Sequence, residues 1–130
     1  MFLKKVLILA FIIIITSCSL DRSNPLDPVS NDITVPGKVT GIEVTINDFN
    51  YIDISWNSMI TVDGFYIYRS QSFAGLYSLL EDYVTSPTDS LFEDQNVIIP
   101  GNFYWYKMSA FINVGDKKLE GYRSEPRTWN

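Results

Sequence analysis

Histidine is absent from the 130-residue sequence, and cysteine occurs only once, at Cys18. Without histidine the chain cannot form a serine–histidine triad, a histidine-ligated metal site or a histidine-containing zinc finger. A lone cysteine also excludes an internal disulfide. Most hydrolase and metalloenzyme classes are therefore excluded, and we expect no cofactor and no metal.

Positive charge is also scarce, with 10 lysines and arginines against 15 acidic residues and a net charge of −5. Lys4 and Lys5 lie in a segment that we expect to be removed, which makes the mature chain more acidic still. A chain with this balance does not hold nucleic acid or an anionic membrane by charge alone. We therefore expect no nucleic-acid partner.

The sequence has one long apolar run, Val6 to Ile15, which follows a short basic region. A membrane-spanning helix needs about 20 apolar residues, so this run is too short to span and is typical of a signal peptide. It ends at Ile15-Thr16-Ser17-Cys18, which resembles the lipobox of bacterial lipoproteins. The resemblance implies cleavage before Cys18, a diacylglyceryl group on its thiol and acylation of its new amino group, palmitate included.

Two alternatives to lipidation remain open: an ordinary signal peptide cut after Ser19, and an uncleaved anchor. In enteric bacteria an aspartate after the cysteine keeps a lipoprotein at the inner membrane, and here that position is Ser19. We expect an envelope protein held in the membrane by lipid, at the outer membrane or cell surface.

Residues 1–17 are thus predicted to be a lipoprotein signal peptide, and residues 18–35 a lipidated cysteine and flexible tether. The stretch from Ser19 to Pro36 is polar, carries three prolines and has neither strand nor helix periodicity. At about 3.3 Å per residue, it could extend on the order of 60 Å from the membrane.

After Pro36-Gly37 the sequence breaks into short β-rich segments between turn residues. The expected strands cover residues 39–46 with a break near Gly41, 51–56, 65–69, 77–80, 91–93, 103–112 and 119–128, with a hairpin loop at 113–118. Because side chains alternate along a strand, Phe65 and Ile67 should face the core, and Tyr66 and Tyr68 the solvent. Pro126 lacks a backbone donor, so the last strand should lie at a sheet edge or leave the ladder there.

Several motifs resemble, in order, the signatures of a bacterial fibronectin type III module over about residues 35–130. They are Pro36-Gly37-Lys38-Val39-Thr40-Gly41, Ile54-Ser55-Trp56, Gly64-Phe65-Tyr66-Ile67-Tyr68-Arg69-Ser70, Phe92-Glu93-Asp94, Gly101-Asn102-Phe103-Tyr104-Trp105-Tyr106-Lys107-Met108-Ser109-Ala110 and Ser124-Glu125-Pro126. The resemblance implies that residues 36–130 form a seven-stranded antiparallel β-sandwich of immunoglobulin-like, all-β class.

In that fold, the first, second and fifth strands form one sheet and the other four strands form the second. The resemblance also implies a buried Trp56 and makes Tyr104 the tyrosine-corner residue, whose hydroxyl bonds nearby backbone. The loop at 113–118 contains Gly115-Asp116 without a preceding arginine, so integrin-type adhesion is not implied.

Catalysis is not expected from the acidic pairs Glu81-Asp82 and Glu93-Asp94, because neighbours on an extended chain point to opposite faces. We therefore expect a non-enzymatic binding or interaction module for a glycan or a surface protein. The alternative is an accessory or spacer subunit of a larger envelope assembly.

The candidate binding face consists of residues expected to point outward from two neighbouring strands: Tyr66, Tyr68, Trp105 and Lys107. The aromatic rings of Trp105 and the two tyrosines would form a flat platform for a sugar or a partner protein. The competing interpretation is that these aromatic residues only stabilise the sheet, as exposed cross-strand pairs do by roughly 0.2–1 kcal/mol.

Overall fold

The structure, a computed structural model, describes residues 32–80 and 86–130. These residues contain strands and loops and no helix. The strands are β1 (Glu43–Ile46), β2 (Ile52–Ser55), β3 (Gly64–Ser70), β4 (Ser78–Leu79), β5 (Leu91–Asp94), β6 (Trp105–Val114) and β7 (Lys117–Glu120).

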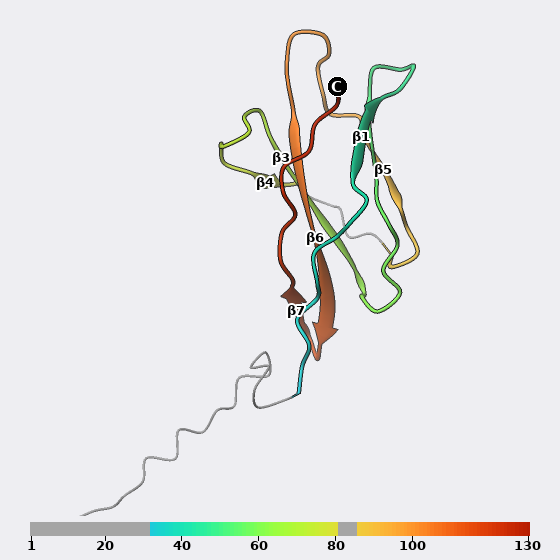
Figure 1. The fold of residues 1–130 in the computed structure, drawn as a ribbon, viewed down its shortest axis with the longest axis vertical. Coiled ribbons are helices and arrows are strands. Elements are labelled where there is room, and N and C mark those ends of the chain that lie inside the picture. The colour runs from blue at the N-terminus through green and yellow to red at the C-terminus, as the bar shows by residue number, and fades with distance from the viewer. Residues whose placement is uncertain (1–31, 81–85) are drawn as a thin grey trace, which may run out of the picture.

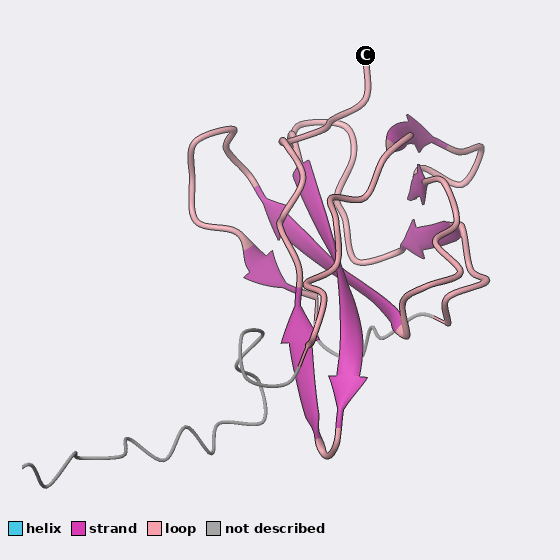
Figure 2. Cartoon of the chain, turned by 60° about the horizontal axis from the view of Figure 1, so that its bottom comes forward, coloured by secondary structure: helices cyan, strands magenta, loops and turns pink. Residues whose placement is uncertain are grey.

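The strands form two antiparallel sheets that pack face to face (Figures 1 and 2). The first sheet has the order β1-β2-β5 and the second the order β4-β3-β6-β7. This is the arrangement that the family resemblance implies, and the prediction of an all-β sandwich is confirmed.

The core lies between the sheets and is made by alternate residues of each strand. Phe65 and Ile67 of β3 are fully buried, as their alternation with Tyr66 and Tyr68 predicts. Inner positions on β6 and on the opposite sheet are also closed to solvent: Ile52, Ile54, Tyr106, Met108 and Ala110. Trp56 lies among them and meets the Phe65 ring edge-on, with 5.3 Å between ring centroids.

Tyr104 takes the tyrosine-corner position, in accordance with the prediction. Its ring is buried, and its hydroxyl accepts a hydrogen bond of 3.2 Å from the backbone N–H of Ile98. The hydroxyl thereby fixes the loop before β6 against the strand that this loop enters.

The hairpin between β6 and β7 is tighter than predicted. Both strands continue into the expected loop at 113–118, and only Gly115 and Asp116 remain as the turn. Gly115 has φ of 63°, a conformation that a two-residue hairpin turn requires and that glycine adopts without steric cost. The polar composition of the loop concealed this longer pairing.

The last strand is shorter than predicted, since β7 ends at Glu120 rather than near Thr128. Beyond it the chain still follows β6, through bonds from Ser124 N to Met108 O and between Arg127 and Tyr106. Compared with the regular pairing to β6, this segment has one extra residue between Glu120 and Ser124 and a second one between Ser124 and Arg127. Such bulges interrupt the ladder, and Pro126 falls in the second one.

The chain enters and leaves the described domain at opposite ends of its long axis, with residue 32 at the bottom of Figure 1 and the C-terminus at the top. Near the point of entry, Pro36 is buried against Gly121. A Cβ atom on Gly121 would collide with the Pro36 carbonyl oxygen, so glycine permits this close approach.

Candidate binding site

The sheet β4-β3-β6-β7 has an outer face that points away from the core, and the predicted binding residues lie on it. Tyr66 is the cross-strand partner of Ser109, and Tyr68 that of Lys107. Trp105 begins β6 opposite Ser70. The alternation read from the sequence thus places the predicted residues on one side of the sheet.

Their expected exposure is wrong for Tyr68, which is only 5% exposed. The guanidinium of Arg123 covers its ring, with the Cζ atom 3.8 Å from the ring centroid. Its hydroxyl donates a hydrogen bond of 2.6 Å to Glu120 Oε1. Tyr68 is therefore a support beneath the surface and not a ring that a ligand could stack on.

Ser109, the cross-strand partner of Tyr66 on this side of the sheet, is also fully buried, for a related reason. Its hydroxyl donates to the same Glu120 oxygen at 2.6 Å, and Arg123 Nε donates to it at 3.2 Å. Burial alone would raise the pKa of the Glu120 carboxyl, but the bonds from Ser109, Tyr68 and Arg123 outweigh burial and lower it. Glu120 is thus an ionised carboxylate that accepts hydrogen bonds from three side chains. No motif or spacing in the sequence predicted this role.

At one end of this face, near the β6–β7 turn, Tyr66 is half-buried against Phe111, with ring centroids 4.8 Å apart. Lys118 Nζ lies 4.8 Å from the centroid of the Phe111 ring. The burial of Tyr66 also raises the pKa of its hydroxyl, and the charge of Glu120 adds to the effect. This end consists of rings with a cation above them.

The other end of the face lies beside the loop between β3 and β4 and is more open. Phe73 from this loop is 58% exposed and meets the half-buried Trp105 ring edge-on, at 5.1 Å between centroids. Next to it, Lys107 Nζ lies 4.6 Å from the centroid of Tyr77. Sequence reasoning missed Phe73 and Tyr77 as site residues because neither belongs to the periodic pattern of β3 or β6.

The loop that presents Phe73 is held by its own hydrogen bonds. The Tyr77 hydroxyl donates to the Phe73 carbonyl at 2.8 Å, and Ser72 N donates to Ser70 Oγ at 3.2 Å. A backbone bond from Gly75 to Ser72 closes the turn. We refer to the outer residues together as the aromatic face: Tyr66, Tyr68, Phe73, Tyr77, Trp105, Lys107, Phe111, Lys118, Glu120 and Arg123.

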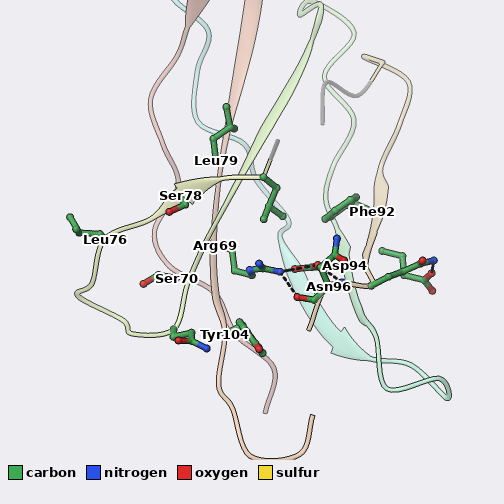
Figure 3. A pocket seen from close by; sticks show the side chains of 13 residues that line it. Arg69, Ser70, Leu76, Ser78, Leu79, Phe92, Asp94, Asn96 and Tyr104 are labelled. Atoms are coloured by element: carbon green, nitrogen blue, oxygen red, sulfur yellow. Dashed lines mark hydrogen bonds and ion pairs between the residues drawn. The ribbon is translucent and has the colours of Figure 1, made fainter. Parts of the chain in front are cut away.

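A hollow of about 970 Å³ lies elsewhere, between the edges of the two sheets, and Arg69 and Asp94 line it (Figure 3). Arg69 Nη1 lies 2.8 Å and 3.0 Å from the two Asp94 oxygens and donates to the Asn96 carbonyl. The Tyr106 hydroxyl also donates to Asp94, at 2.8 Å. These polar groups join β3, β5 and β6, so we interpret them as structural.

The outer side of the sheet β1-β2-β5 is acidic. Asp53 and Glu93 are cross-strand partners, and the Asn47 amide donates to both, at 3.1 Å and 2.6 Å. Glu93 and Asp94 point to opposite faces, as predicted, since Asp94 is only 2% exposed and lies inside. Within residues 32–80 and 86–130, no three histidine, cysteine or acidic side chains gather in a way that could hold a metal ion.

Several sequence predictions lie outside the described residues: the signal peptide at 1–17, the lipidation site Cys18, most of the tether at 18–35, and the pair Glu81-Asp82. In the described part of the chain, no helix is long and apolar enough to cross a membrane.

Comparison with known proteins supports the fold. No protein-family model and no curated protein matches the sequence. A solved structure, described as the crystal structure of a Fn3-like protein from Clostridium thermocellum, aligns with a TM-score of 0.61 and 22% sequence identity. The alignment covers 75% of this chain and 94% of that one. The described part of the chain therefore forms a β-sandwich of the fibronectin type III type.

Proposed function

We propose that this protein is a lipid-anchored binding module of the cell envelope, without catalytic activity, that recognises a glycan or a surface protein through the aromatic face. The pattern Ile15-Thr16-Ser17-Cys18 supports the anchor, and the outer-membrane or surface location is part of the proposal. Folds of this type host many functions, so the site has to support the activity.

The observation that carries the proposal is the exposed pair of rings formed by Phe73 and Trp105. A phenylalanine that is 58% exposed on a folded domain leaves a large apolar area in water. Its edge-on contact with Trp105 and the hydrogen bond to its carbonyl fix its position before any ligand arrives. Binding then orders few additional side chains, and rigid aromatic side chains dominate the energetics of many interfaces.

The position of these rings on the domain suits a tethered module. The loop at 71–77 lies in the upper half of Figure 1, away from residue 32, where the chain enters the domain. An anchor at Cys18 would therefore join the domain at the end away from these rings.

The test is retention of envelope polysaccharide or envelope protein by the full chain and by Phe73→Ala. We expect this variant to lose at least about tenfold in retention, while its melting temperature stays within a few degrees, since surface changes usually alter stability by less than about 0.5 kcal/mol.

Phe49→Ala is the matched control, because Phe49 is 76% exposed and stacked on Tyr51, outside the aromatic face. Equal retention by both variants and the parent would contradict the proposal and favour a spacer without a ligand.

A further inference from the structure

Three cations lie over three rings of the aromatic face. Lys107 Nζ lies 4.6 Å from the Tyr77 centroid, Arg123 Cζ 3.8 Å from that of Tyr68, and Lys118 Nζ 4.8 Å from that of Phe111. A ring attracts a cation through its quadrupole but does not neutralise its charge. The rings hold these groups in place and leave their charge available.

The aromatic face supplies little counter-charge of its own. Within the part of the chain that the structure describes, the ion pairs are Lys38–Glu125, Arg69–Asp94 and Arg123–Glu120. Neither Lys107 nor Lys118 takes part in one of them. Three cations with the single carboxylate of Glu120 leave the aromatic face with a net charge of +2.

This positive face belongs to an acidic chain, so the charges are separated in space. The strands of the opposite sheet carry Glu43, Asp53 and Glu93 and contain no lysine or arginine, while their fourth acidic residue, Asp94, is paired with Arg69. The net charge of −5 therefore does not describe the aromatic face. A partner that approached this face would meet local positive charge, which steers anions and raises their rate of association.

We propose that the aromatic face binds an acidic polysaccharide whose sugar rings carry carboxylates. This inference rests on the proposed function and names the class of its ligand. Phe73 and Trp105 offer apolar surface to the C–H faces of sugar rings. Lys107, Lys118 and the part of the Arg123 guanidinium not bonded to Glu120 would each donate charge-assisted hydrogen bonds to carboxylates.

A polymer suits this face better than one acidic side chain of a protein would. The rings and cations recur across the sheet from Phe73 and Trp105 at one end to Phe111 and Lys118 at the other. A polysaccharide presents the same two groups, a flat ring and a carboxylate, at every acidic unit. One chain lying across β3 and β6 could use several of these contacts at once, which multiplies weak single affinities.

The experiment measures binding of the full chain, in neutral detergent, to polygalacturonate beads and to dextran beads. We expect retention on polygalacturonate alone, at about 0.01 M salt, and loss of most of it at about 1 M salt, where the Debye length falls to about 3 Å. Lys107→Gln/Lys118→Gln should weaken binding at least about tenfold.

The matched control is Lys38→Gln/Lys117→Gln, which removes the same charge off the aromatic face. Lys38 is paired with Glu125, and Lys117 is on the other side of β7 from Lys118. This control should bind polygalacturonate within about threefold of the parent. Equal losses in both double variants would show an effect of overall charge and overturn the inference.

Absence of binding to polygalacturonate would also overturn it. If Phe73→Ala still abolished retention of envelope material in that case, the proposed function would stand and only the ligand class would fall. If sedimentation showed salt-sensitive dimers that Lys107→Gln/Lys118→Gln abolishes, without binding to polygalacturonate, the acidic sheet of a second copy would replace the polysaccharide as the occupant.

Discussion

Arg123 covers the ring of Tyr68 from a position beyond the end of β7, with its Cζ atom 3.8 Å from the ring centroid. β6 separates β3 from β7 in the sheet, so the Arg123 side chain crosses a neighbouring strand to reach this ring. Arg123 lies within the bulge between Glu120 and Ser124. The aromatic face is therefore a layer of rings with cations above it, and Phe73 and Trp105 provide its accessible ring surface.

The burial of the Tyr68 and Tyr106 hydroxyls predicts how the stability of the domain changes in alkaline solution. Burial, followed by the hydrogen bond to Glu120, raises the pKa of Tyr68 to about 12, and burial with the nearby charge of Asp94 raises that of Tyr106. In the unfolded chain both hydroxyls titrate near their ordinary pKa of about 10. The unfolded chain then releases these protons first, so the free energy of unfolding should hold up to about pH 10 and fall above it.

Urea unfolding at several pH values from about 8 to about 11 measures this effect. Tyr68→Phe removes one of the titrating groups, so its free energy of unfolding should fall less steeply above about pH 10. A parent whose stability stays constant to about pH 11, or a variant with the same slope as the parent, would contradict the assignment.

The Arg69–Asp94 pair gives a second prediction. Asp94→Ala leaves the half-buried Arg69 without its carboxylate and removes the acceptor of the Tyr106 hydroxyl. Loss of one partner of a buried pair costs about 3–5 kcal/mol, and chemical denaturation should show a loss of that size. Arg69→Met/Asp94→Leu, which removes both charges, should recover much of it. A loss below about 1 kcal/mol in Asp94→Ala would contradict the structural role of the pair.

The alternation of side chains was enough to predict much of the sandwich. It placed Phe65 and Ile67 inside and Tyr66 outside, and the family resemblance supplied the role of Tyr104. The exposure of Tyr68 could not be read in the same way, because it depends on contacts with Glu120 and Arg123, more than 50 residues later in the chain. Alternation assigns a side of the sheet, but covering depends on tertiary structure.

Phe73 was missed for a different reason. It belongs to the turn between β3 and β4, where no period relates it to the aromatic residues of the strands. A large aromatic residue in the turn Ser72-Phe73-Ala74-Gly75 was the available signal, since such a residue has no core to enter from a surface loop.

The third prediction tests the core. Trp56→Ala should cost about 3–5 kcal/mol, because it removes a large buried ring that packs on Phe65. The indole Nε1 of Trp56 has no hydrogen-bond partner in the described structure, so Trp56→Phe loses no such bond and should cost less. The denaturant midpoints of the two variants measure these losses of stability. An unchanged midpoint in Trp56→Ala would contradict the assignment of the core.

The fourth prediction concerns Cys18, which the anchor requires. The parent protein should partition into the detergent phase of a phase-separated extract, and Cys18→Ala should accumulate as an unprocessed precursor, because the thiol carries the lipid in the family that this segment resembles. Mass spectrometry of both proteins distinguishes the outcomes. A Cys18→Ala protein that matures normally, by cleavage after Ser19, would refute lipidation.

The central claim, that the aromatic face is the binding surface, can be tested residue by residue. The chain has 3 tryptophans, each with one indole N–H signal in a nitrogen-15 spectrum, and Trp105→Phe identifies the signal on the aromatic face. On titration with the envelope fraction that the full chain retains, the Trp105 signal should shift, while that of Trp56, buried in the core, should stay in place. A shift of Trp129 without one of Trp105 would place binding elsewhere and contradict the account.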